Sequence, residues 1–280
     1  MDYQRKCWMF MFLMMIVLFQ DTNAKRFVLI HGSGHGAWCW YKLVALLTSS
    51  GHDVAALDMP ASGINLQHVL DVPTISNYFR PLMDFMDSIP TREKVILVAH
   101  SSGGLAVSRA MERFSDKISV SVFVTALMPG ASLNVSTLNQ EFLRSQQGSL
   151  MDSRYSYDNG DDKPPTTLML GPKYLSVNMY QLSPIQDWSL ATMLVRPVYL
   201  YTEEDMSREL VLSSKKYASV SRVYIMTDED KVARKKLQQW MIRQNPPDEV
   251  VEIEGSDHMV MMSRPTELFD VLLLIAQNYS

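Results

Sequence analysis

The sequence has few cysteines and no strong excess of either charge. Its 280 residues include two cysteines, which excludes a small scaffold held together by disulfides. Lys plus Arg number 26 against 30 Asp plus Glu, and no long basic run is present, so a nucleic-acid partner is not expected. Fixed-period repeats and low-complexity tracts are missing too, which excludes solenoids and fibres.

The chain does contain the material for a large hydrophobic core. Apolar residues make up 47% of it and aromatic residues 10%, which excludes an intrinsically disordered chain. The length is nearly twice a typical domain of ~150 residues, yet α/β folds often reach about 250 residues as one domain. No linker divides the chain, so we expect a single domain over residues 25–280.

The first 24 residues differ from the rest. Arg5 and Lys6 precede an uncharged apolar run of 13 residues, 7–19. A helix of that length spans about 20 Å, and a bilayer core needs about 20 residues, so no stable membrane span is expected. The run suits a signal peptide, with Thr22 and Ala24 as the small residues before cleavage. We therefore predict that the protein is secreted or resides in the secretory pathway. The alternatives are that the segment is a retained membrane anchor, or that the start site is wrong. The alternative location is the cytoplasm.

Short apolar runs alternate with helical patterns along most of the chain. Strands are expected at 27–30, 54–57, 95–98, 120–126, 223–226 and 250–253, and helices at 38–47, around 78–86, 104–114, 235–243 and 266–279. This alternation predicts an α/β fold with a mostly parallel sheet and helices on both faces. From about 129 to 212 it stops, and this part is interpreted as an inserted cap over the carboxyl edge of the sheet.

Ser101 lies in the strongest local motif, between an expected strand and an expected helix. The segment 99–104 reads Ala-His-Ser-Ser-Gly-Gly, which matches the nucleophile elbow G-x-S-x-G with Ala99 in place of the first glycine. Small neighbours are needed there because the strand and the helix approach each other closely. The alternative is a glycine-rich turn whose serine has no chemical role.

A serine nucleophile needs a base, and the base needs an acid to orient it. In folds with a nucleophile elbow the acid and then the histidine follow the serine along the chain. Among six histidines only His258 follows Ser101, so the order selects it as the base. The acid should follow the strand 223–226, and the spacing leaves Asp228, Glu229 and Asp230 open.

The reaction also needs an oxyanion hole, a set of backbone N–H groups that stabilise the negative oxygen of the tetrahedral intermediate. One donor should be the amide of Ser102, and the other should come from the loop after the first strand, 31–36. That loop reads His-Gly-Ser-Gly-His-Gly. It lacks the Lys-Ser/Thr of a P-loop and the G-x-G-x-x-G spacing, which argues against a phosphate site.

Taken together, these motifs resemble the plant methylesterase and hydroxynitrile lyase family of α/β-hydrolases. The resemblance runs from about Arg26 to Tyr279 and implies the α/β-hydrolase fold. The segments that carry it are 27–32, 35–38, 40–43, 56–58, 61–63, the elbow, 170–173, 222–225 and 255–259. It also implies Ser101, Asp230 and His258 as the catalytic residues, and the amides of Ser33 and Ser102 as the oxyanion hole.

Two chemistries occur in this family, and two positions favour one of them. The lyases are expected to need a Thr after the first loop's His and a Lys after the catalytic His. Here those positions hold Gly32 and Met259, and Met259 cannot stabilise a leaving cyanide. The resemblance therefore implies a carboxylesterase that acts on methyl esters of small apolar acids, such as methyl jasmonate, methyl salicylate or methyl indole-acetate.

Substrate choice is assigned to the cap, with Leu170 and Trp188 as binding candidates beside Gly32 and Met259. No metal or cofactor is expected. The expected partner is a small-molecule ester, and a homodimer stays open. Three alternatives remain: an esterase on an indole-alkaloid methyl ester followed by decarboxylation, a hydroxynitrile lyase, and a ligand receptor on a hydrolase fold with little turnover.

Overall fold

The computed structural model describes residues 24–145 and 150–279. The predicted signal peptide, apart from Ala24, lies outside these residues and stays a prediction. No helix within the described residues is both long and apolar enough to cross a membrane.

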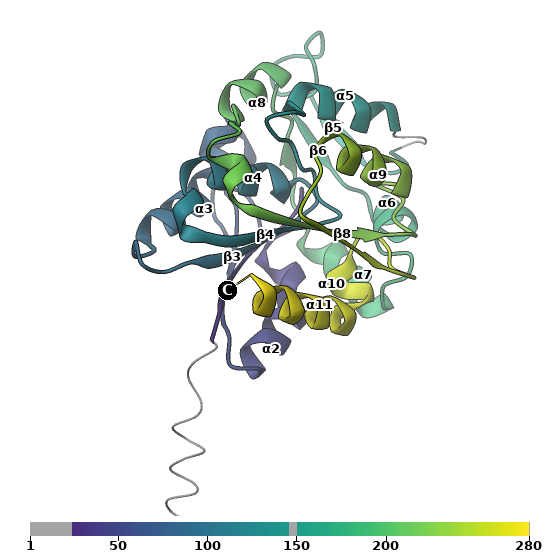
Figure 1. The fold of residues 1–280 in the computed structure, drawn as a ribbon. Coiled ribbons are helices and arrows are strands. Elements are labelled where there is room, and N and C mark those ends of the chain that lie inside the picture. Colours follow the sequence, from purple (N-terminus) through teal and green to yellow (C-terminus); the bar gives the residue numbers. More distant parts are fainter. Residues whose placement is uncertain (1–23, 146–149, 280) are drawn as a thin grey trace, which may run out of the picture.

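A six-stranded parallel sheet forms the centre of the molecule (Figure 1). Its strand order is β2-β1-β3-β4-β8-β9, and every neighbouring pair is parallel. The bounds are β1 Arg26–Ile30, β2 Asp53–Leu57, β3 Val95–His100, β4 Ile118–Val124, β8 Ser221–Thr227 and β9 Glu249–Ile253. The predicted α/β class is confirmed. The prediction placed β4 two residues too far along, because the backbone at Thr125 takes φ +43° and leaves the strand.

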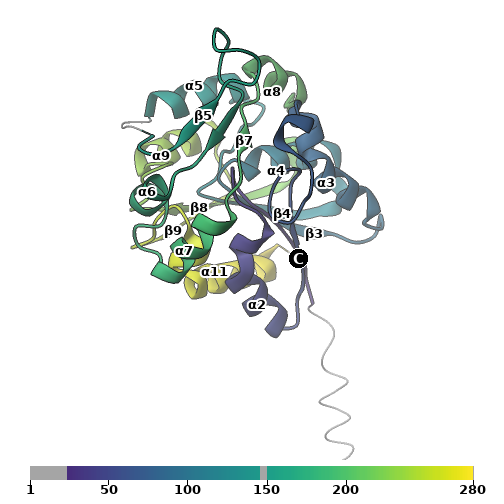
Figure 2. The same ribbon diagram turned by 180° about the vertical axis from the view of Figure 1, so that it is seen from behind.

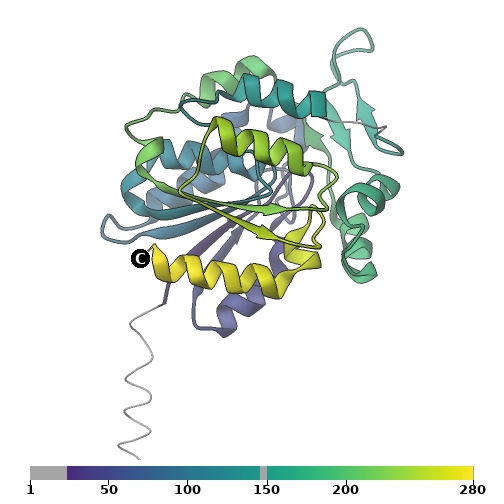
Figure 3. The ribbon, with the colours of Figure 1, turned by 45° about the vertical axis from the view of Figure 1, so that its right-hand side comes forward.

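Helices cover both faces of this sheet (Figure 3). Alternate residues of β1 show why: Phe27 and Leu29 pack with the helices on one face, whereas Val28 and Ile30 pack on the other. The first face carries α2 (Tyr41–Ser49) and α11 (Pro265–Asn278). The second carries α3 (Ile75–Ser88), α4 (Gly103–Arg113) and α9 (Lys235–Gln244). Burial on both faces explains why the central strands β1 and β3 contain continuous apolar runs, at 27–30 and 95–99.

The segment 129–212 contains a second, antiparallel sheet of order β5-β6-β7, which lies outside the main sheet (Figure 2). Helices α6 and α7 lie beside it, whereas α5 and α8 contact each other and pack near α9 and α3. The bounds are α5 Val135–Ser145, β5 Arg154–Ser156, β6 Thr167–Met169, α6 Pro172–Tyr174, the π-helical turn η4 Leu175–Met179, α7 Ile185–Leu194, β7 Val198–Tyr199 and α8 Glu203–Glu209.

Buried polar contacts attach this segment to the rest of the domain. The Asp187 carboxylate, only 1% exposed, accepts hydrogen bonds from Tyr41 Oη at 2.8 Å and Lys42 Nζ at 2.5 Å. The backbone N–H of Arg196 donates to Gly34 O at 2.9 Å. The remaining short helices are η1 Ala37–Trp40, η2 Val69–Asp71, η3 Ser115–Lys117, η5 Tyr217–Ser219 and α10 Val260–Ser263.

Candidate active site

The predicted site residues follow four strands of the main sheet. The loop 31–36 follows β1, Ser101 follows β3, Asp230 follows β8 and His258 follows β9. Because the strands are parallel, all four segments leave the same edge, where α/β folds bind their ligands. Side chains far apart in the sequence thus meet there.

The turn that carries Ser101 has the geometry of a nucleophile elbow. Ser101 has φ +52°, a left-handed conformation that costs a residue with a side chain free energy. The two glycines after it leave no room for a side chain: a β-carbon at Gly103 would lie 2.7 Å from the carbonyl oxygen of His31, and one at Gly104 would collide with the carbonyl of Leu127. Ala99 is fully buried in β3 and fits there. The turn therefore holds Ser101 in its strained conformation.

Asp230 and His258 form a buried pair. His258 Nδ1 lies 2.7 Å from Asp230 Oδ2, with both side chains at most 1% exposed. The other carboxylate oxygen of Asp230 accepts hydrogen bonds from the backbone N–H groups of Val232 and Ala233. These bonds fix the carboxylate in its orientation toward the imidazole.

The other two carboxylate candidates make different contacts. Asp228 Oδ1 accepts a hydrogen bond from the backbone N–H of Gly255 at 2.8 Å, which ties the two loops together. Glu229 is exposed, and its backbone carbonyl accepts from Gln181 Nε2. The spacing of the sequence left three carboxylates open, and the one that contacts His258 is Asp230.

The second ring nitrogen of His258, Nε2, is buried. Among the described residues Nε2 has no hydrogen-bond partner. The ring packs against that of His100 at a centroid distance of 4.6 Å, and His100 Nε2 donates to the backbone carbonyl of His258 at 2.8 Å. The imidazole is thus held by its hydrogen bond to Asp230 and by the packing of the His100 ring against it.

The loop after β1 lies directly against the nucleophile turn. A β-carbon at Gly32 would come within 2.7 Å of Ser101 Cβ, so any larger residue at that position requires Ser101 to shift. The hydroxyl groups of Ser33 and Ser102, the two predicted oxyanion-hole residues, lie 2.7 Å apart. The structure therefore brings both residues together beside Ser101.

Three of the predicted substrate-binding residues lie in or beside the apolar cluster on the sheet face that carries α2 and α11. Met259 is fully buried and Leu170 is 9% exposed, and both belong to the same cluster. Leu170 also lies against the loop after β1, close to Gly34. Trp188 is half-buried beside this cluster, and its indole N–H donates to Pro172 O at 3.1 Å.

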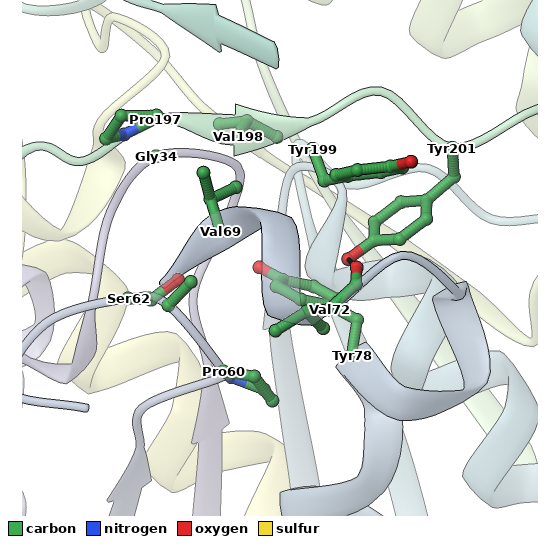
Figure 4. Close-up of a pocket in the computed structure, with 11 residues that line it drawn as sticks. Gly34, Pro60, Ser62, Val69, Val72, Tyr78, Pro197, Val198, Tyr199 and Tyr201 are labelled. Carbon is green, nitrogen blue, oxygen red and sulfur yellow. Dashed lines mark hydrogen bonds between the residues drawn. The ribbon is translucent and has the colours of Figure 1, made fainter. Parts of the chain in front are cut away.

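A small cavity lies nearby, between Gly34, β7 and the start of α3 (Figure 4). Its volume is about 10 Å³, with Tyr78, Tyr199 and Tyr201 among its lining residues. That is room for about one water molecule, so this cavity cannot hold an ester substrate. The described residues also contain no cluster of three or more His, Cys, Asp or Glu placed to bind a metal.

Three buried histidines around the site are held in the neutral form. Burial lowers the pKa of His35 to about 4 and also lowers the pKa of His31 and of His100 from the ordinary 6.5. Desolvation is the main cause, because removing an imidazolium from water is costly. Neutral rings can both donate and accept hydrogen bonds, which matters for the loop after β1.

The lowered pKa of His35 predicts a loss of stability in acid. In the unfolded chain His35 takes up a proton near pH 6.5, but in the fold only near pH 4. Between these values the unfolded state binds more protons, so the free energy of unfolding falls as the pH drops, by about 2 kcal/mol at pH 5. Urea unfolding at pH 7 and pH 5 should show this loss, and His35→Leu should lose less. An equal loss in both proteins would contradict the assignment of this pH dependence to His35.

Comparison with known proteins agrees with this geometry. Residues 27–271 match the model of the alpha/beta hydrolase family. Methyl jasmonate esterase 1 of Vitis vinifera is 49% identical, covering 93% of this chain and all of that protein. The crystal structure of tomato methylketone synthase I complexed with 2-tridecanone is 54% identical, with a TM-score of 0.89, and covers 92% of this chain and all of that chain. Polyneuridine aldehyde esterase is 39% identical, with a TM-score of 0.85, and covers 90% of this chain and 99% of that chain.

The fold and these relatives define a class first: the chain belongs to the α/β hydrolase family. Within it, the chain is a carboxylic ester hydrolase of the plant methylesterase group. The resemblance drawn from the sequence motifs is thereby confirmed.

Sequence reasoning missed several residues that contact the site. His31 and His35 are predicted only as parts of a glycine-rich loop, and Tyr180 only as a residue within the predicted cap, 129–212. His100 was read only as a neighbour of Ser101. The pattern His-Gly-x-Gly-His was the only available signal for the first two. Their partners lie far away along the chain, so no local motif could reveal them.

Proposed function

We propose that this chain hydrolyses methyl esters of small, mostly apolar carboxylic acids, with Ser101 as nucleophile, His258 as base and Asp230 as the orienting acid. The observation that carries the proposal is the buried Asp230–His258 hydrogen bond, at the sheet edge where Ser101 stands in a strained turn. A carboxylate, an imidazole and a serine in this chain order are the components of nucleophilic ester hydrolysis.

The reaction follows from the roles of these groups. Ser101 Oγ attacks the ester carbonyl carbon while His258 Nε2 takes the hydroxyl proton. The backbone N–H groups of Ser33 and Ser102 stabilise the resulting oxyanion. The bond to the methoxy group then breaks, and methanol leaves with the proton from His258. Water, deprotonated by His258, attacks the acyl-enzyme and releases the carboxylic acid and free Ser101.

The surroundings support an esterase over a lyase. The position after His258 holds Met259, an uncharged and fully buried side chain that offers no charge to a leaving cyanide. Gly32 has no hydroxyl group, whereas the lyases are expected to need the threonine hydroxyl at this position. The apolar surfaces of Leu170, Trp188 and Met259 suit a hydrophobic acyl group. The similar grape protein is named for methyl jasmonate, which has this character.

A panel of methyl esters tests the proposal. We expect multiple turnovers on at least one of methyl jasmonate, methyl salicylate and methyl indole-acetate, with equimolar methanol and acid. An alkaloid methyl ester and a methyl β-keto ester belong in the panel, because the tomato relative was also solved with β-ketoheptanoate. Ketone and carbon dioxide from the last would indicate decarboxylation after hydrolysis.

Two controls separate the alternatives. Mandelonitrile tests the lyase chemistry, and cyanide release in place of ester hydrolysis would contradict the proposal. Product formation that stops after about one equivalent per protein would favour a receptor.

A further inference from the structure

Two histidines of the loop after β1 contact the carbonyl groups of that same loop. His31 is 1% exposed and His35 is fully buried, and the reaction uses neither ring directly. Histidines of this kind can simply fill space. Here, however, the partner of each ring nitrogen is known, and the partners determine where each proton lies.

The tautomer of His31 is set by Met59. The backbone N–H of Met59 lies 3.1 Å from His31 Nε2, and because an amide nitrogen only donates, Nε2 must accept. The proton of the neutral ring is then on Nδ1, which donates to the carbonyl oxygen of Gly32 at 2.8 Å. The lowered pKa of the buried His31 keeps the ring in this neutral form.

This bond, together with one from the backbone N–H of His35 to the same oxygen at 3.3 Å, orients the amide proposed to stabilise the oxyanion. The carbonyl of Gly32 and the N–H of Ser33 belong to one peptide unit, and the described residues contain no cis peptide. In a trans peptide the two groups point in opposite directions. A His31 that holds the carbonyl of Gly32 on one side therefore directs the N–H of Ser33 to the other.

The next carbonyl is held by His35 in the same way. His35 Nδ1 lies 3.0 Å from the carbonyl oxygen of Ser33, which can only accept, so Nδ1 carries the proton. His35 Nε2 must then accept the hydrogen bond from the hydroxyl of Tyr180 at 2.8 Å. Burial raises the pKa of Tyr180 well above its usual 10, so the hydroxyl keeps its proton.

Tyr180 joins this loop to the inserted segment 129–212. It follows η4, is 3% exposed, and stacks on the ring of His35 at a centroid distance of 5.9 Å. Trp38 stacks on the same ring, at 5.3 Å. The imidazole therefore contacts two aromatic rings and makes two hydrogen bonds whose directions agree.

We propose that His31 and His35 are positioning residues that hold the oxyanion loop in its reactive conformation, and that Tyr180 couples the cap to this loop by fixing the tautomer of His35. This inference rests on the proposed ester hydrolysis and names the residues that prepare its oxyanion hole. Two hydrogen bonds connect these groups: the hydroxyl of Tyr180 donates to His35 Nε2, and His35 Nδ1 donates to the carbonyl of Ser33.

A double-mutant cycle tests the coupling. His35→Leu should lower kcat by about 10- to 100-fold and change KM by less than about 3-fold, because an oxyanion hole acts on the transition state. His35→Asn retains an N–H donor for the carbonyl of Ser33 and should recover most of that loss.

Tyr180→Phe should lower kcat by about 5-fold in the wild-type background. In the His35→Asn background it should have under about 2-fold effect, because an amide has no tautomer to fix.

A purely structural role of Tyr180 gives a different result. Tyr180→Phe would then lower kcat equally in both backgrounds, and that outcome would overturn the coupling. Equal kcat for His35→Leu and His35→Asn would overturn the positioning role of His35. Tyr217→Phe is the matched control: this buried tyrosine bonds Asn245 through its hydroxyl and lies outside the loop, so kcat should not change.

One measurement does not depend on turnover. Nitrogen-15 NMR of the histidine rings in the folded protein should show His35 with a protonated Nδ1, and Tyr180→Phe should shift or broaden that signal. A wild-type His35 protonated on Nε2 would overturn the inference whether or not the protein hydrolyses esters. Absence of any turnover that depends on Ser101, with the expected tautomer present, would instead count against the proposed function.

Discussion

Replacing Ser101 with alanine is expected to abolish ester hydrolysis, with kcat falling by about 10⁴- to 10⁶-fold, while the protein stays folded. The hydroxyl is the only group lost, and removing the nucleophile of a serine hydrolase has effects of this order. Alanine keeps the β-carbon, so the strained backbone at φ +52° is unchanged. Steady-state hydrolysis of the best ester in the panel, together with thermal unfolding, measures both effects.

Ser108→Ala serves as its control. Ser108 is a fully buried serine in α4, the helix that follows the nucleophile turn. Loss of its hydroxyl should leave kcat within about 2-fold of wild type. A Ser101→Ala protein with activity near that of wild type would place the nucleophile elsewhere.

The second large effect is expected for Asp230→Asn, which should lower kcat by about 10⁴-fold with little loss of stability. An asparagine can still accept the hydrogen bonds from Val232 and Ala233 through its oxygen. Its N–H then faces His258 Nδ1, which must accept, and the ring proton moves to Nε2. In that tautomer His258 cannot take the proton of Ser101, and the same substitution in another serine hydrolase costs about this much.

Asp228→Asn is the matched comparison, two residues away. The side chain of Asp228 accepts from the backbone N–H of Gly255, and an asparagine oxygen can replace it. We expect kcat within about 5-fold of wild type, since this contact only ties the loops together. A greater loss for Asp228→Asn than for Asp230→Asn would show that the acid has been assigned to the wrong carboxylate.

The parts of the site that follow local rules could be predicted from the sequence. Apolar runs marked the strands, and the strand–turn–helix context of Ser101 marked the turn. His258 is the only histidine after Ser101, so chain order alone selected it. Parallel strands then place these segments at one edge of the sheet, and the hydrogen-bond register agrees with that expectation.

The choice among Asp228, Glu229 and Asp230 shows where local reasoning stopped. All three lie in one turn, and a shift of one residue in a loop redirects the side chain. The resemblance to the methylesterases implied Asp230, and the contact with His258 agrees with it. The selection depends on the path of the backbone after β8, which the hydrogen bonds of Val232 and Ala233 to the carboxylate help to set.

Periodicity, residue order and glycine placement in the sequence were enough to predict the α/β class and the parallel sheet, and to select Ser101 and His258 as candidates, because each of these signals can be recognised in short segments of the chain. The contacts that orient the site depend on the assembled fold. Tyr180 and His35 are 145 positions apart, and Asp230 and His258 are 28 apart. Each pair meets only when separate loops reach the same edge of the sheet, and no local pattern encodes a hydrogen bond between side chains that the packing of the whole domain brings together.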